Sequence, residues 1–300
     1  MKNFEELVQY VQHSPSKKNA VLVAAHDEHS LEAIYEACEK GLVEPIYIGD
    51  KEKILAIAAA HDFHIDEAKI IDEKEDVAAA KKAVDMVNAG EVDVIMKGKI
   101  QTADLLKQVV NKEYGLKEAD VMSHVGVFEV PGYPKLMVIT DAGMLPTPTL
   151  EQKVKITENA IHVVKKLGIE NPKIAALAAA EIENVKIQAS VEAAELKRMN
   201  HAGTFPGCIV EGPISYDLVV SKESAEIKGY SSPITGDADI LVVPDMTAGN
   251  LLAKALLFSG NSKLAGIIVG AKVPIVLTSR GSSSEEKFFS IALAAAVSGN

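Results

Sequence analysis

The chain has 300 residues, of which 48% are apolar, and carries 31 Lys and Arg against 42 Asp and Glu, a net charge of −11. This length and apolar content predict two globular domains, or one large one, and argue against an intrinsically disordered chain. The acidic balance argues against a nucleic acid or an anionic membrane surface as a partner.

The first residues and the cysteines further restrict the kind of protein and the compartment in which we expect it. Residues 1–13 predict an amphipathic helix and lack the apolar core of a signal peptide. No apolar run approaches the roughly 18 residues of a membrane span. The two cysteines, Cys38 and Cys208, lack the spacing of a disulfide framework or a zinc site. We therefore expect a cytoplasmic protein with no membrane partner.

Over the first 120 residues, short apolar runs alternate with segments of helical periodicity. Strands are expected at 21–25, 45–48, 68–71 and 92–96. Helices are expected after Ser30, over 51–61, and over 77–87, where Gly90 is placed to end the helix. Buried strands separated by single helices predict a parallel sheet with helices on both faces.

Near residue 120 the pattern changes. Residues 125–130 and 135–140 flank a Pro-Gly-Tyr-Pro turn and predict an antiparallel hairpin. Thr149 and Gln152 have the spacing of a capping box, which predicts the start of a long helix. Alternation then resumes, with strands expected at 174–178, 208–210, 240–243 and 267–269, and helices from Ser190 and Ala248.

These patterns predict two α/β domains, each with three layers. The first is expected to be discontinuous, with residues 1–120 plus 266–300, because a strand at 275–278 would return to the first sheet. The second is expected to cover 121–265. A chain that leaves a domain and re-enters it forms an interdomain cleft, which is a natural place for a substrate.

The segment 274–287 carries the strongest functional signal. After the expected strand, Ser279 and Arg280 precede a turn, and Ser283 stands three residues before Glu286, a capping-box spacing. A hydroxyl, a guanidinium and the free N–H groups of a helix start together suit an anion with several oxygens, such as phosphate. A simple N-cap beside a surface ion pair explains the same residues, and spacing does not decide between the two.

Further candidates follow other expected strands. Lys97 ends one strand, and Thr102 opens a helix that carries Lys107, so these residues are placed for contact with phosphate. A solvated basic turn is the alternative.

Asp141 also follows a strand, where it would orient a substrate, bind a metal ion or cap its own backbone. Asn250 and Lys254 lie near the start of the helix after 240–243. They would face the cleft or merely form part of the helix.

Taken together, five stretches in chain order resemble the phosphate acetyltransferase and phosphate butyryltransferase family, and are closer to its butyryl branch. They are Met96-Lys97-Gly98, Ile139-Thr140-Asp141-Ala142, Thr149-Leu150-Glu151-Gln152-Lys153, 236–244 with Gly249-Asn250, and 278–280 with Ser283 and 290–294. The resemblance covers nearly the whole chain. It implies two α/β domains like those of isocitrate and isopropylmalate dehydrogenases, with an interdomain cleft, and a homodimer or higher homo-oligomer.

The resemblance also implies the reversible reaction of acyl-CoA with phosphate to give acyl phosphate and CoA, with a butyryl-like chain. CoA is a substrate, and no metal ion or other cofactor is expected. The catalytic residues implied are Ser279 and Arg280, which match residues that bind the phosphoryl group and polarise the carbonyl, and Glu286, at the position of a base for the CoA thiol. The substrate-binding residues expected are Lys97, Thr102, Lys107, Asp141, Asn250, Lys254 and Ser283.

Three positions depart from the family pattern. Glu286 replaces an Asp, Lys107 stands where Arg is usual, and Leu145 stands where the family has Asn. Two other functions remain open on these residues. One is a metal- and NAD-dependent decarboxylating dehydrogenase on the same fold, and the other is a non-catalytic protein that binds acyl-CoA or acyl phosphate.

Overall fold

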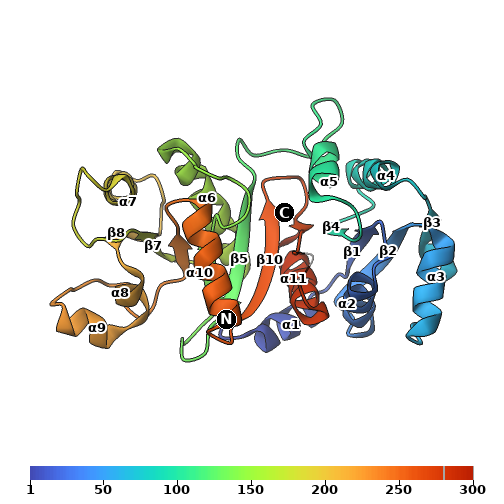
Figure 1. Cartoon of the computed structure of the whole chain (residues 1–300), viewed down its shortest axis with the longest axis horizontal. Helices are drawn as coiled ribbons and strands as arrows, with labels where there is room; N and C mark the ends of the chain where they lie inside the picture. The colour runs from blue at the N-terminus through green and yellow to red at the C-terminus, as the bar shows by residue number, and fades with distance from the viewer. Residues whose placement is uncertain (280, 300) are drawn as a thin grey trace. The chain divides into compact units, whose positions relative to one another are not determined.

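The computed structural model describes residues 1–279 and 281–299 and has a mixed α/β architecture (Figure 1). The chain forms two compact units. The terminal unit contains Glu5–Met122 and the chain from Ala265 onward, and the middle unit contains Met1–Phe4 and Ser123–Leu264. Among the described residues, no helix has both the length and the apolar character needed to cross a bilayer.

The terminal unit is built on a sheet with the strand order β3-β2-β1-β4-β11-β10. Its strands are β1 (Lys18–Val23), β2 (Val43–Gly49), β3 (Ile70–Asp72), β4 (Val94–Lys97), β10 (Lys263–Val269) and β11 (Ile275–Val276). The first four strands and β11 are parallel, and β10 runs antiparallel to β11. Ile275 pairs with Ile95 and Val276 with Met96, so the end of β11 lies beside the end of β4.

Helices precede, connect and follow these strands. They are α1 (Phe4–Gln12), α2 (Glu28–Glu39), α3 (Lys51–Ala60), the 3₁₀ turn η1 (Glu67–Lys69), α4 (Asp76–Asn88), α5 (Thr102–Val109) and α11 (Ser284–Val297). The helix expected after Ser30 begins at Glu28, because the Asp27 side chain caps it by accepting a hydrogen bond from the N–H of Ser30. α11 packs against α2.

The middle unit has the strand order β5-β6-β9-β7-β8. Its elements are β5 (Ser123–Glu129), β6 (Met137–Thr140), α6 (Leu150–Lys166), β7 (Lys173–Leu177), α7 (Gln188–His201), β8 (Ile209–Ile214), α8 (Tyr216–Val220), α9 (Lys222–Ile227), β9 (Ile240–Val242) and α10 (Met246–Phe258). The predicted hairpin is confirmed, since β5 and β6 pair antiparallel. The predicted capping box is confirmed too, because Thr149 and Gln152 exchange hydrogen bonds at the start of α6.

The backbone of the terminal unit is closely packed where β4 ends beside β1. The N–H of Gly98 donates to the Val23 carbonyl at 2.8 Å, and the N–H of Lys99 donates to the Ala24 carbonyl at 3.0 Å. A Cβ atom at position 98 would lie 2.4 Å from the Ala24 oxygen and 2.6 Å from the Val23 oxygen. Only glycine therefore fits at position 98, where the backbone leaves β4 between residues Lys97 and Lys99.

We predict that Gly98→Ala lowers the free energy of unfolding by about 1–3 kcal/mol or more, because backbone oxygens cannot move aside as a flexible side chain would. Chemical denaturation measures this change. Gly281→Ala is the control, because its Cβ would meet no atom within 4 Å. A Gly98→Ala protein as stable as the control would show that the backbone here yields easily.

Candidate active site

A cavity of about 390 Å³ opens in the terminal unit where β1, β4 and β11 end. It is lined by Asp27, Lys97, Gly98, Lys99, Ile100, Gln101, Ser279 and Lys287. Three of these side chains are cationic and one is anionic. A concave site with this balance suits an anionic ligand, although the whole chain is acidic.

Lys97 is the last residue of β4 and is only 9% exposed. Its Nζ donates a hydrogen bond to the Gly98 carbonyl at 3.1 Å. The alternative of a solvated basic turn is therefore wrong for Lys97, whereas Lys99 is exposed. The strand holds Lys97 in the cavity wall, and its contact with phosphate stays a prediction.

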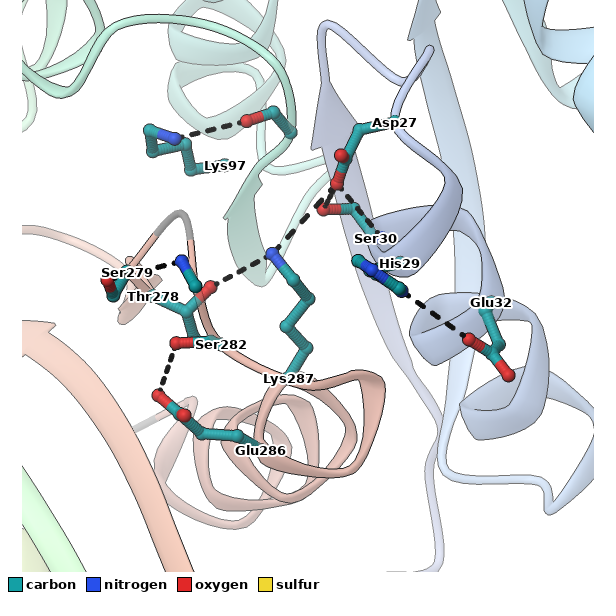
Figure 2. A network of polar contacts seen from close by, with 12 residues as sticks. Asp27, His29, Ser30, Glu32, Lys97, Thr278, Ser279, Ser282, Glu286 and Lys287 are labelled. Carbon is teal, nitrogen blue, oxygen red and sulfur yellow. Dashed lines mark hydrogen bonds and ion pairs between the residues drawn. The ribbon is translucent and has the colours of Figure 1, made fainter. Parts of the chain in front are cut away.

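The connection from β11 to α11 supplies the other wall. The Ser279 hydroxyl oxygen accepts a hydrogen bond from the N–H of Gly281 at 3.4 Å (Figure 2). Ser283 caps α11, with its oxygen accepting from the N–H of Glu286 at 3.2 Å, as the spacing predicted. Arg280 lies outside the described residues.

Glu286 is half-buried and turns toward Ser282, whose hydroxyl donates to Oε1 at 2.6 Å (Figure 2). Burial raises the pKa of this carboxyl, opposed by the Ser282 hydrogen bond and the charge of Lys287. A raised pKa is the direction that a general base at neutral pH requires. Glu286 is not among the described residues that line the cavity.

Sequence reasoning missed Lys287, which is 6% exposed although it follows two exposed or half-buried acidic residues. Its Nζ donates to Thr278 Oγ1 at 3.3 Å and lies 3.9 Å from Asp27 Oδ2. Burial lowers the pKa of Lys287, opposed by the charges of Asp27 and Glu286. The helical spacing could have indicated that Lys287 is buried, because Lys287 stands one turn before Ile291 on the buried face of α11.

Asp27 was missed as well, because the sequence predicted the start of this helix only after Ser30. Its Oδ2 accepts hydrogen bonds from the N–H of Ser30, at 3.0 Å, and from the Ser30 hydroxyl. These bonds hold the carboxylate at the start of α2, facing the cavity that Lys287 also lines.

Two other predicted residues of the terminal unit lie on α5. Thr102 is its first residue and Lys107 stands in its last turn. Both are exposed, and neither is among the described residues that line the cavity. Their binding roles stay predictions.

The remaining predicted residues belong to the middle unit. The buried Asp141 carboxylate accepts hydrogen bonds from the N–H groups of Gly143, Met144 and Leu145 at 2.8, 2.9 and 3.2 Å. It thus caps its own turn, as one alternative held. Leu145 takes part in this turn through its backbone N–H, so the turn forms without the asparagine side chain that the family has at this position.

Asn250 and Lys254 lie inside α10, which begins at Met246 with Asp245 as its cap rather than at Ala248. The Asn250 side chain donates to the Ala142 carbonyl at 3.5 Å, and the exposed Lys254 follows one turn later. Asp141 and Asn250 therefore meet at the same turn. Contact of any of these three residues with a substrate stays a prediction.

A lysine-lined cavity at the strand ends of an α/β fold suits an anionic ligand, and comparison with known proteins gives the class of protein. Residues 75–295 match the family described as Phosphate acetyl/butaryl transferase. A phosphate acetyltransferase of Thermotoga maritima is 45% identical over 278 residues, 93% of this chain and 94% of that protein. A phosphate butyryltransferase of Clostridium acetobutylicum is 40% identical over 300 residues, 100% of this chain and 99% of that protein.

A solved structure agrees with these relatives. The branched-chain phosphotransacylase from Enterococcus faecalis V583 is 37% identical, with a TM-score of 0.82 over 93% of this chain and 99% of that chain. The chain therefore belongs to the phosphate acetyl/butyryl transferase family, as the resemblance implied. It is a phosphate acyltransferase, an enzyme that exchanges an acyl group between CoA and phosphate.

A more distant likeness concerns the fold alone. A 4-hydroxythreonine-4-phosphate dehydrogenase from Burkholderia phymatum has a TM-score of 0.56 at 13% identity. A dehydrogenase thus shares this fold. Because the family is that of the phosphate acyltransferases, the dehydrogenase and non-catalytic alternatives are set aside.

The raised pKa of Glu286 gives a test of its surroundings. A carboxyl whose pKa is higher in the folded state stabilises the fold at low pH, and this contribution is lost as pH rises through the folded pKa. We predict that Glu286→Gln gains stability relative to the native protein between about pH 4 and about pH 7, because the amide stays neutral. Urea unfolding at both pH values measures this, and a constant difference would mean that burial does not shift the pKa of Glu286.

Proposed function

We propose that this enzyme prefers a short acyl chain of the butyryl type and transfers it reversibly between CoA and inorganic phosphate. The observation that carries the proposal is the cavity that joins Lys97 to Ser279 at the ends of β4 and β11. Five matching stretches closer to the butyryl branch support the chain length. The acetyltransferase relative has the higher identity and the butyryltransferase relative the longer span, so identity does not decide the acyl group.

In the direction of acyl-CoA synthesis, Glu286 accepts the proton of the CoA thiol. The thiolate sulfur attacks the carbonyl carbon of the acyl phosphate, the bond from that carbon to the phosphate oxygen breaks, and phosphate leaves. A thiol with a pKa near about 8.5 is only a few per cent ionised at neutral pH, so a base that accepts its proton increases the reactive thiolate. The raised pKa of Glu286 supports this assignment.

Charge develops on the carbonyl oxygen and on the departing phosphate. Lys97 and Ser279 line the cavity and are assigned to these oxygens. Arg280 is assigned to the same task because it follows Ser279 directly in the stretch that resembles the family. Thr102, Lys107, Asp141, Asn250, Lys254 and Ser283 are retained as substrate-binding residues. The proposed reaction uses CoA as a substrate and no further cofactor, in a cytoplasmic homodimer or higher homo-oligomer.

Acyl preference is tested by thiol release from acetyl-, propionyl-, butyryl- and branched-chain acyl-CoA, with and without phosphate. We expect phosphate-dependent release with the highest kcat/KM for butyryl-CoA or a branched chain of similar length. A clear preference for acetyl-CoA would overturn the chain length but leave the reaction in place. Release that does not depend on phosphate would overturn the reaction itself.

The base is tested by Glu286→Gln, which we expect to lower kcat for acyl-CoA synthesis by about 10²–10⁴-fold because the thiol loses its proton acceptor. Glu285→Gln is the control, since Glu285 is an exposed acid on the same first turn. If the two variants have equal rates from pH 6 to pH 8, proton removal takes place elsewhere.

Arg280→Ala tests the guanidinium. We expect kcat/KM to fall by about 10²–10³-fold, because a charge-assisted donor to the developing oxyanion is lost. Steady-state kinetics in both directions measure the loss. Acyl transfer near the native rate would remove Arg280 from the site.

A further inference from the structure

Lys287 has more hydrogen-bonding capacity than its surroundings use. A lysine ammonium has three N–H donors and no acceptor. Within residues 1–279 and 281–299, its contacts are one hydrogen bond of 3.3 Å to Thr278 and an ion pair of 3.9 Å with Asp27. Buried charged groups are ordinarily paired and hydrogen-bonded. A lysine that is 6% exposed and whose ammonium is only partly hydrogen-bonded is therefore prepared for a further, anionic partner.

The direction of the side chain shows where such a partner would lie. Figure 2 shows Lys287 reaching from α11 toward the start of α2, while the neighbouring Glu286 turns to Ser282. Lys287 lines the same cavity as Lys97 and Ser279. An anion in this cavity would meet ammonium groups from two elements, the end of β4 and the first turn of α11.

Asp27 does not satisfy Lys287 by itself. The oxygen nearest to the ammonium, Oδ2, already accepts two hydrogen bonds from Ser30 and caps α2. At 3.9 Å it attracts the ammonium but forms no hydrogen bond with it. The carboxylate thus holds the charge of Lys287 toward the cavity and leaves donors for a ligand.

We propose that Lys287 binds the phosphoryl oxygens of phosphate and of acyl phosphate, and that Asp27 acts as its positioning residue. The inference rests on the proposed function, to which it adds a phosphate-binding residue that the family resemblance did not supply. A phosphoryl dianion offers several oxygens, so the open N–H groups of Lys287 and the ammonium of Lys97 can be used together. The diphosphate of CoA shares this chemistry, and the test separates the two sources.

Lys287→Met removes the ammonium and keeps a flexible side chain of similar length. We expect the KM for phosphate to rise by about tenfold to a hundredfold, the usual effect of losing a hydrogen bond to a charged group. The KM for acyl-CoA is expected to stay within about twofold of the native value. Thiol release from acyl-CoA, with phosphate and acyl-CoA varied in turn, gives both constants.

Lys112→Met is the matched control, because Lys112 is exposed and lies outside the cavity. An unchanged KM for phosphate in Lys287→Met would overturn the proposal. A rise in the KM for acyl-CoA alone would overturn it in favour of a CoA phosphate. If the native enzyme releases no thiol with phosphate, the proposed function fails. If the native enzyme is active and Lys287→Met matches it, only the role of Lys287 fails.

Asp27→Asn gives a second test that does not depend on Lys287→Met folding. Asparagine caps a helix as well as aspartate does, so α2 keeps its N-cap. The charged groups facing Lys287 are Asp27 from α2, Glu286 on α11, and Lys97 and Lys99 from the end of β4. Burial lowers the pKa of Lys287 and Asp27 opposes that shift, so removing the Asp27 charge lowers the pKa further.

Lysine is charged below its pKa, so phosphate binding is lost as pH rises through it. We expect the KM for phosphate to rise between about pH 8 and about pH 10 in the native enzyme, and the rise to begin at lower pH in Asp27→Asn. The pH dependence of this KM, measured on both proteins, is the readout. The same profile in both would show that Asp27 does not position a phosphate-binding ammonium.

Discussion

The site depends on one strand pairing, the parallel contact of β11 with β4. Ile275 lies opposite Ile95 and Val276 opposite Met96, so both strands end at the same edge of the sheet. Lys97 is the last residue of one strand, and Ser279 and the start of α11 follow the other. Without this pairing, residues far apart in the sequence would not line one cavity. The hydrogen bonds of a short two-residue strand therefore set the distance between the two cationic walls.

The candidate active site is distinguished by lysine side chains that are buried. A chain with a net charge of −11 keeps Lys97 and Lys287 almost entirely out of solvent, within one cavity. Removing ammonium groups from water is unfavourable, and for Lys287 the described residues offset this only partly, through the Thr278 hydroxyl and the distant carboxylate of Asp27. A phosphoryl group would complete the compensation. The arrangement explains how an acidic protein attracts an anion, because local charge rather than total charge governs binding.

Much of the fold follows from local patterns. Alternating apolar runs predicted the order of strands and helices, and the spacings of Thr149 with Gln152 and of Ser283 with Glu286 predicted two helix starts. The short helices α8 and α9 were missed, because five- and six-residue helices show too little periodicity.

The site was less predictable. Lys97 and Ser279 were found from their positions at strand ends, whereas Lys287 was hidden behind its acidic neighbours. Its burial is a tertiary property, set by the packing of α11 against α2, and the orientation of Glu286 toward Ser282 is likewise a rotamer that spacing alone does not fix.

The neighbours Glu286 and Lys287 are adjacent on one rigid helix, yet their side chains point to different places, because successive helical residues are rotated by about 100°. The carboxylate and the ammonium are therefore mechanically linked. If the connection between β11 and α11 were one residue longer, Glu286 and Lys287 would both be displaced, whereas Lys97 would keep its place at the end of β4. The length of that connection is thus constrained together with the residues it carries, among them Thr278, which accepts a hydrogen bond from Lys287, and Ser279, which lines the cavity.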